Sequence, residues 1–212
     1  LYLGSASGLS TTPVWNSSGD DQAYAYYGFS VASAGDVNND SYDDVIVGAH
    51  RYDAIKADAG KAYLYLGSAS GLSPVWNSSG DDQLEAYYGY SVASAGDVNN
   101  DNYDDIIIGA YGYDTENANA GKIYLYFGSS TGPGNTANWT NSGDDQLSAW
   151  YGCSVASAGD VNNDGYDDVI VGAYKYTTAN SEAGKAYLYL GSESGPLDTW
   201  NSSGDDQGGA WY

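Results

Sequence analysis

Three nine-residue segments place oxygen-bearing side chains at alternate positions. The first segment runs from Asp36 to Asp44 with the sequence DVNNDSYDD, so positions 1, 3, 5 and 9 carry side-chain oxygens. Position 7, Tyr42, offers its backbone carbonyl. A donor set of carboxylates and carbonyls without histidine or cysteine suits a hard cation, and six or seven flexible oxygen ligands favour Ca²⁺ over Mg²⁺. We therefore predict one Ca²⁺ site per segment, three in the chain.

The predicted ligands occupy equivalent positions in all three segments. They are Asp36, Asn38, Asp40, Tyr42 and Asp44 in the first, Asp97, Asn99, Asp101, Tyr103 and Asp105 in the second, and Asp160, Asn162, Asp164, Tyr166 and Asp168 in the third. Position 6 differs, being Ser41, Asn102 or Gly165. Glycine and asparagine adopt a left-handed backbone more easily than serine, so we expect the first site to be the weakest. The alternative is an acidic turn that binds nothing.

These segments belong to a longer internal repeat, which must supply the elements that position them. The sequence SVASAGDVNND occurs three times without change, and equivalent aspartates are 61 and 63 residues apart. A second marker, SGDDQ, occurs four times. In the first repeat, short strands are expected over residues 29–35, 44–49 and 61–67 and around residues 75–77, because apolar runs there are bounded by Gly, Asn and Asp. The acidic segment would join the first two strands.

Repeated units of four short strands are typical of β-propeller blades, so we predict an all-β fold of four-stranded antiparallel sheets. The small residues of the first strand would suit the crowded inner edge of such a fold. The repeat tryptophans would fill space between blades, and stacking on sugars is the alternative role. These tryptophans are Trp15, Trp76, Trp139 and Trp200.

The repeat boundaries predict three complete blades and one partial blade. Residues 1–27 would supply strands three and four of a partial blade, and residues 28–88, 89–151 and 152–212 would form blades 1 to 3, the last including the start of a further repeat. An open stack exposes sheet edges and faces. We therefore expect the chain to belong to a larger ring or repeat assembly, completed by other copies of itself or by the rest of a longer chain.

The pattern around the acidic segments resembles a known family. Residues 27–32, YGFSVA, followed by GDVNND and DDVIVGA, are similar to the FG-GAP repeat, which forms the propeller of integrin α subunits. The resemblance implies that the fifteen positions given above are Ca²⁺ ligands in loops between strands one and two of each blade. The chain departs from the family pattern at Tyr27-Gly28 and at His50, where the family has FG and a proline.

Composition narrows the function classes. The 212 residues carry 28 acidic and 6 basic side chains, a formal charge of −22. Clustered cations, which nucleic acids and anionic membranes require, are absent, and no apolar run is long enough to insert into a membrane. His50 is the only histidine, so no Ser-His-Asp set is evident, and each acidic cluster recurs in similar surroundings, whereas paired acid/base catalysis needs two different ones. We expect a protein without enzymatic activity.

Three smaller features remain open. Candidate glycosylation sites at Asn16, Asn77, Asn138 and Asn201 are expected at one equivalent place per repeat, near strand four. They favour an extracellular or cell-surface protein, although the same residues also suit turns. SGDDQ is expected to be a turn that bonds its own backbone, with a weak second cation site or a polar tie between blades as alternatives. His50 is expected at the surface.

The sequence thus predicts an extracellular Ca²⁺-binding propeller that serves adhesion or forms a surface or filament scaffold by blade-to-blade self-association. The alternative is a lectin-like or protein-binding propeller module, attached to a larger secreted protein, with an extracellular protein or glycan as its partner.

Overall fold

A computed structural model describes residues 1–203, except for the side chains of residues 198–200. The described residues form fourteen strands and no helix. The first sheet contains β3 (Ser30–Gly35), β4 (Asp44–Ala49), β5 (Lys61–Leu66) and β6 (Ser73–Ser78). The second contains β7 (Ser91–Gly96), β8 (Asp105–Ala110), β9 (Lys122–Tyr126) and β10 (Trp139–Asn141), and the third contains β11 (Ser154–Gly159), β12 (Asp168–Ala173), β13 (Lys185–Leu190) and β14 (Leu197–Ser202). These bounds confirm the predicted strands.

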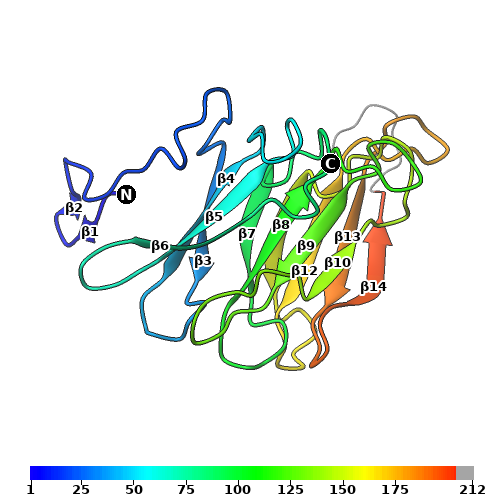
Figure 1. Ribbon diagram of the computed structural model, residues 1–212. Coiled ribbons are helices and arrows are strands. Elements are labelled where there is room, and N and C mark those ends of the chain that lie inside the picture. The colour runs from blue at the N-terminus through cyan, green and yellow to red at the C-terminus, as the bar shows by residue number, and fades with distance from the viewer. Residues whose placement is uncertain (204–212) are drawn as a thin grey trace.

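Each of the three large sheets is antiparallel, and each strand pairs with its neighbour in the chain. Figure 1 shows the sheets standing side by side, so that the acidic loops of successive sheets become neighbours. The first strands lie against one another: Val92 N–H donates to Ser30 Oγ (3.2 Å), and Val155 N–H donates to Ser91 Oγ (3.0 Å). Small side chains on these strands permit the close approach. The all-β, blade-like architecture predicted from the repeat is confirmed.

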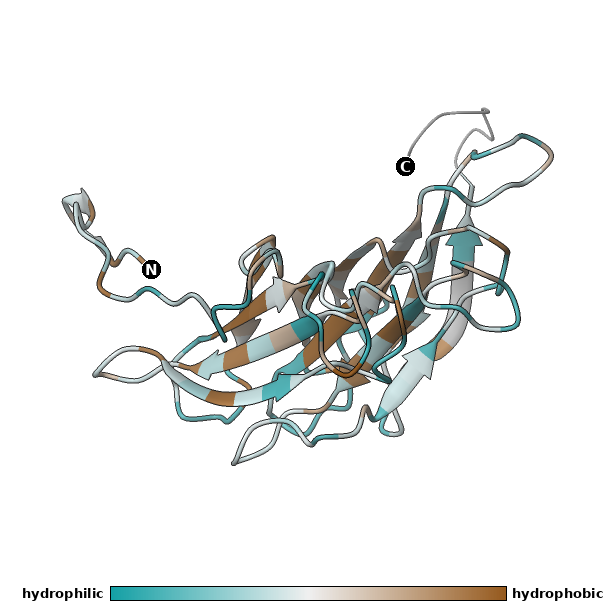
Figure 2. Cartoon of the chain, turned by 45° about the horizontal axis from the view of Figure 1, so that its top comes forward, coloured by the Kyte–Doolittle hydropathy of each residue, from teal (hydrophilic) through white to brown (hydrophobic). Residues whose placement is uncertain are grey.

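The hydrophobic core lies between the sheets. Strand β8 is buried along its whole length, because Ile106 and Ile108 pack toward the first sheet and Ile107 packs toward the third. In Figure 2 the apolar residues are concentrated in the strands, whereas the connecting loops are mostly polar. A sheet covered on both faces needs apolar residues at consecutive positions, which accounts for the run of isoleucines.

The tryptophans pack between repeats, as predicted. Trp15 meets the ring of Tyr65 edge-on with centroids 4.8 Å apart, and Trp76 meets Tyr126 in the same way at 5.0 Å. Trp139 contacts Tyr189 at 5.2 Å. The side chain of Trp200 lies outside the described residues. Each of these three tryptophans therefore links its own repeat to the next one.

The N-terminal segment differs from a half-blade. It forms only β1 (Gly4–Ser5) and β2 (Gly8–Leu9), and in Figure 1 it lies apart from the three sheets. Two hydrogen bonds of the expected hairpin remain, from Ser10 N to Leu3 O (2.8 Å) and from Val14 N to Leu1 O (3.0 Å). In the complete blades the third strand also pairs with the second. Residues 1–27 contain no such second strand, and the expected strands three and four of the partial blade take the form of the short β1–β2 hairpin.

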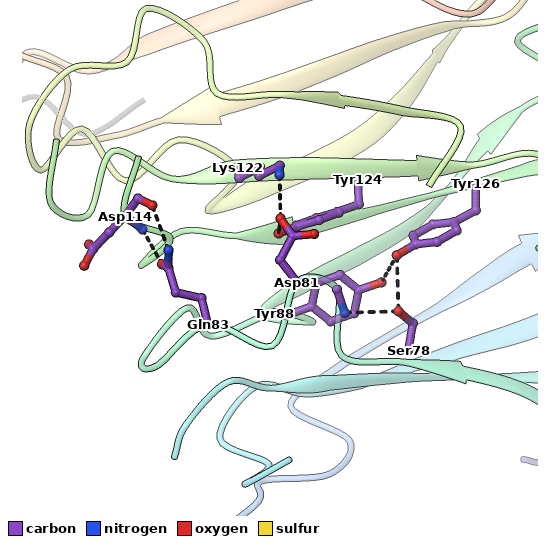
Figure 3. A network of polar contacts seen from close by, with 9 residues as sticks. Ser78, Asp81, Gln83, Tyr88, Asp114, Lys122, Tyr124 and Tyr126 are labelled. Carbon is purple, nitrogen blue, oxygen red and sulfur yellow. Dashed lines mark hydrogen bonds and ion pairs between the residues drawn. The ribbon is translucent and has the colours of Figure 1, made fainter. Parts of the chain in front are cut away.

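The SGDDQ segment ties one sheet to the next, which was the less favoured interpretation of its sequence. Asp81 forms an ion pair with Lys122 (2.6 Å), and the Gln83 amide donates to Asp114 O (2.8 Å) while accepting the Asp114 N–H (Figure 3). Burial raises the pKa of Asp81, but Lys122 outweighs that effect and the pKa lies below its ordinary value. The expected turn is also present, because Asp82 N–H donates to Ser79 O (3.0 Å). The segment is both a turn and an interblade tie.

His50 is buried rather than exposed. Its side chain is only 5% accessible and packs against the rings of Phe29 and Tyr90, with centroid distances of 4.3 and 5.3 Å. Among the described residues, its Nδ1 atom has no hydrogen-bond partner. Burial and the neighbouring Arg51 charge lower the pKa of His50 to about 4. The surface prediction was wrong because His50 occupies the place of the aromatic residues Tyr111 and Tyr174.

Candidate metal loops

The three acidic segments form equivalent loops at one end of the sheets. They connect β3 to β4, β7 to β8 and β11 to β12, as the sequence predicts. A register shift between Ser33 and Gly35 interrupts the pairing of β3 with β4 just before its last pair, Gly35 with Asp44, and Gly35 has a φ of +75°. The chain therefore leaves the first strand in a sharp turn that directs the next residue, Asp36, into the loop.

The side chains at positions 1, 3 and 5 come together in each loop. Asp36 accepts hydrogen bonds from the backbone N–H groups of Asp40 (2.9 Å) and Ser41 (2.7 Å). The Asn38 amide donates to the Asp40 carboxylate (2.9 Å). The second and third loops repeat these contacts with distances of 2.8–3.0 Å. In every loop the side chains at positions 1 and 3 are therefore both hydrogen-bonded to the residue at position 5.

The position 9 aspartate is placed differently. Asp44 is fully buried, and its carboxylate accepts the N–H groups of Val37 (2.9 Å) and Gly67 (2.8 Å). Asp105 and Asp168 make the equivalent contacts with Val98 and Gly128 and with Val161 and Gly191. This residue therefore fastens the loop to the end of the third strand. Sequence spacing alone did not indicate that structural role.

Ionisation of the loop carboxylates depends on their burial. Burial raises the pKa of Asp105 to about 8, although backbone N–H groups of Gly128 and Val98 oppose the shift. Burial also raises the pKa of Asp44. The exposed Asp160 shows the opposite direction, because the Gly165 N–H and other backbone donors lower its pKa. The pKa values of the buried Asp44 and Asp105 and of the exposed Asp160 are therefore shifted in opposite directions.

The backbone of each loop turns through left-handed residues. Position 4 has φ values of 54°, 58° and 60° at Asn39, Asn100 and Asn163, and position 6 has values of 73°, 71° and 91° at Ser41, Asn102 and Gly165. Asparagine and glycine tolerate this region, whereas serine adopts it at a greater energetic cost. The conformation on which the expected weakness of the first site depends is therefore present at Ser41.

The residue types of the loops fit a hard cation, but the predicted ligands are not gathered around one point. The side chains at positions 1, 3, 5 and 9 carry carboxylate and amide oxygens, without histidine or cysteine, and the Asn38 amide nitrogen rather than its oxygen faces the Asp40 carboxylate. Within residues 1–203, no three carboxylate, imidazole or thiol groups lie close enough together to hold an ion. In the first loop the position 9 carboxylate, that of Asp44, is held apart by the backbone. Each of its two oxygens accepts one backbone N–H and keeps a second acceptor direction.

A continuous group of aromatic rings lies at the opposite ends of the same strands. We call it the aromatic ladder, and it consists of Tyr26, Phe29, His50, Tyr87, Tyr90, Tyr111, Trp150 and Tyr174. Arg51 lies over Tyr26 and Tyr87, 5.6 and 5.7 Å from the ring centroids. Lys175 lies 3.6 Å from the Trp150 ring centroid. In the described part of the chain, neither cation forms an ion pair.

The candidate glycosylation sites are not all equivalent. Asn77 and Asn201 are exposed and pair across their sheets with Tyr63 and Tyr187. Asn16 is exposed in the N-terminal segment. In the second sheet Thr140 takes the corresponding place opposite Tyr124, and Asn138 lies two residues earlier, where its amide oxygen accepts the Phe127 N–H (2.9 Å). The expectation of one equivalent site per repeat is therefore wrong for Asn138.

Among the described residues, no helix could cross a membrane.

Comparisons with known proteins agree with the repeat and its loops. The FG-GAP repeat matches residues 27–65, 88–126 and 154–189, together more than half of the chain, and each match contains one acidic loop. Integrin alpha-5 of Xenopus laevis is 30% identical over 200 residues, covering 89% of this chain and 18% of the relative.

Two further integrin chains give the same picture. Integrin alpha-6 of Gallus gallus is 32% identical over 151 residues, which cover 69% of this chain and 13% of the relative. Integrin alpha-V of Gallus gallus is 31% identical over 181 residues, covering 81% and 17% of the two chains. The chain spans less than a fifth of the length of these relatives. The resemblance drawn from the motifs is confirmed, and the chain belongs to the FG-GAP repeat family.

Proposed function

We propose that this chain is a non-enzymatic, calcium-binding propeller module of an extracellular adhesion or surface-scaffold protein. The observation that carries the proposal is the threefold repetition of one loop geometry, in which the side chains at positions 1 and 3 are both hydrogen-bonded to the residue at position 5. Oxygen donors on a flexible loop are the ligands that Ca²⁺ takes in proteins. The similarity to integrin alpha chains supports the adhesion role.

The chain's own residues would hold one ion in each loop. In the first loop, Asp36, Asn38 and Asp40 already lie together, and the Tyr42 carbonyl and Asp44 would complete the set. A bound Ca²⁺ would offset the mutual repulsion of these carboxylates. Because Asp44 also anchors Val37 and Gly67, an ion at this loop would stabilise the junction of the first three strands. We propose three ions per chain on these grounds.

The adhesion role rests on repetition without an asymmetric site. The loops recur in near-identical surroundings, as do the Asp–Lys pairs Asp20–Lys61, Asp81–Lys122 and Asp144–Lys185. Acid/base catalysis needs two groups held in different environments, and such duplication does not create one. A repeated surface suits structural or binding roles better.

Blade-to-blade association follows from the sheet contacts inside the chain. The first and second sheets, and the second and third, meet through equivalent residues such as the Ser30–Val92 and Ser91–Val155 pairs. The same contact could join this chain to another copy or to the rest of a longer chain. We propose that the assembly grows through such contacts.

A native mass spectrum of the chain with added Ca²⁺ tests the ions and the assembly together. We expect three Ca²⁺ per chain and a series of oligomers. The Asp40→Ala variant should carry two ions, because its first loop loses one converging carboxylate. A spectrum without bound Ca²⁺ would contradict the metal loops, and a strict monomer with three ions would contradict self-association alone.

The aromatic ladder favours a second candidate function, a lectin-like or protein-binding module. Exposed Tyr26 and half-buried Trp150 present ring faces at the strand ends opposite the acidic loops, with Arg51 and Lys175 beside them. Rings of this kind contact sugars or partner side chains. Glycan-array binding that is lost in Trp150→Ala but kept in Trp76→Phe would support this role. Equal binding by both variants would count against it.

A further inference from the structure

The eighth residue of each acidic loop lies next to the predicted position 9 ligand but has a different partner. Asp104 of the second loop reaches back to the first loop, where its carboxylate accepts the Asp36 N–H (2.7 Å). The Asp104 N–H in turn donates to the Asp36 carbonyl (3.1 Å). Both backbone groups of the position 1 residue in one loop are therefore held by one residue of the next loop.

The second and third loops repeat this contact. The Asp167 carboxylate accepts the Asp97 N–H (3.0 Å), and the Asp167 N–H donates to the Asp97 carbonyl (3.1 Å). The glycines that precede the position 1 residues make room for these carboxylates, because a Cβ atom on Gly35 or Gly96 would collide with Asp104 or Asp167. Two independent copies of the contact indicate a built feature of the junction.

A second connection runs through the third strand of the second sheet. Asp105 accepts the Gly128 N–H (2.9 Å), and the adjacent Ser129 N–H donates to the Val37 carbonyl in the first loop (3.0 Å). The position 9 residue of one loop thus helps to place the residue after position 1 in the preceding loop. The first and second loops are therefore connected by hydrogen bonds in two places, directly through Asp104 and indirectly through Asp105.

We propose that Asp104 and Asp167 couple neighbouring loops, so that Ca²⁺ binding at one loop raises the affinity of the next. This inference rests on the proposed calcium function. An ion would fix the backbone of Asp36, and that backbone fixes Asp104 and, one residue further, Asp105. The first ion therefore orders the junction that both loops share. The second ion binds to a loop that needs less ordering, so its binding costs less conformational entropy. Such shared ordering produces positive cooperativity.

Asp43 provides a matched control within the same chain. It has the same loop position as Asp104 and Asp167, but within the described residues its side chain makes no hydrogen bond. Removing the Asp43 carboxylate changes the local charge without breaking a link between loops. A variant at this position therefore separates the effect of charge from the effect of coupling.

Calorimetric titration of the full chain with Ca²⁺ tests the proposal. The wild type should bind three ions with an affinity that rises at least about fivefold between the first and last, a typical size for coupled sites. Asp104→Ala combined with Asp167→Ala should still bind three ions, but the affinity of each loop should no longer depend on whether its neighbour is occupied. Asp43→Ala should remain cooperative. The Asp104→Asn and Asp167→Asn pair should keep much of the cooperativity, since an amide oxygen can accept the same N–H.

The possible outcomes distinguish a failure of the coupling from a failure of the proposed calcium binding. Three independent ions on the wild type, or cooperativity that survives in the double alanine variant, would overturn the coupling and leave the metal loops intact. Absence of bound Ca²⁺ on the folded wild type would overturn the metal loops themselves, and the coupling with them. Circular dichroism of each variant without Ca²⁺ establishes that it is folded. If the double alanine variant is not folded, the single variants Asp104→Ala and Asp167→Ala serve in its place, because each should uncouple one pair of loops.

Discussion

At the residue scale, the aspartates of one loop have two distinct roles. Asp101 is exposed and interacts with groups of its own loop, whereas Asp105 is buried and joins the loop to the third strand through Gly128. The spacing of the motif predicts both residues as ligands and cannot distinguish them. The distinction arises from burial, which depends on the packing of neighbouring sheets.

This difference predicts unequal effects of alanine substitution within the second loop. Asp105→Ala should lower the free energy of unfolding by about 2–4 kcal/mol even without Ca²⁺, because two buried N–H groups lose their acceptor. Asp101→Ala should cost less than about 1 kcal/mol without Ca²⁺ but should lose one ion. Denaturant unfolding in chelator checks both values. Equal losses for the two variants would contradict the assigned roles.

The burial of His50 predicts that the free energy of unfolding falls at acidic pH. Its folded pKa of about 4 lies below the ordinary value of 6.5, so the folded state favours the neutral imidazole. The stability linked to this group is complete above pH 6.5 and is lost as the pH falls toward 4. Against His50→Tyr, which restores the residue type of Tyr111 and Tyr174, the wild type should lose about 2 kcal/mol between pH 7.5 and pH 5. Denaturant unfolding of both proteins at the two pH values measures this. The same difference in free energy of unfolding between wild type and His50→Tyr at both pH values would show that His50 is not buried in its neutral form.

At the element scale, the sheets are joined by contacts that recur with the repeat. The strands themselves follow from the sequence, because the apolar runs and the Gly, Asn and Asp clusters between them mark the strand limits closely. The interblade contacts of Asp104 and Gln83 could not be predicted, because their partners Asp36 and Asp114 lie 68 and 31 residues away. The repeat shows that these residues recur at equivalent positions, but it does not show which residues they contact.

The glycines at the ends of the first strands provide a matched test of this junction. Gly35 and Gly159 both have positive φ values, 75° and 67°, but only at Gly35 would a Cβ atom meet a carboxylate, that of Asp104. The backbone strain of an alanine is therefore similar at the two sites. Gly35→Ala should destabilise the protein by about 1–3 kcal/mol more than Gly159→Ala, because overpacking adds to that strain. Equal thermal shifts would contradict the close contact.

At the scale of the whole molecule, the three sheets stand side by side with their acidic loops in a row. The aromatic ladder lies at the other strand ends. The fold class follows from the sequence because the repeat fixes the strand number and spacing. In the N-terminal partial blade, the predicted strands three and four take the form of the short β1–β2 hairpin, without a second strand from residues 1–27 to pair with.

The central claim is that cations bound in the three loops stabilise the row of sheets. At about 1 mM free Ca²⁺, with dissociation constants of about 0.1–1 mM, three independent sites would add about 1–4 kcal/mol. A variant that combines Asp40→Ala, Asp101→Ala and Asp164→Ala removes the position 5 carboxylate from each loop and should lose this contribution.

The most direct measurement is therefore thermal unfolding of the wild type and of this triple variant, each in 1 mM Ca²⁺ and in chelator, with Mg²⁺ at about the same concentration as the control. We predict that chelation lowers the melting temperature of the wild type clearly, that Mg²⁺ does not restore it, and that the triple variant responds to neither. An identical melting temperature for the wild type with and without Ca²⁺ would contradict the account.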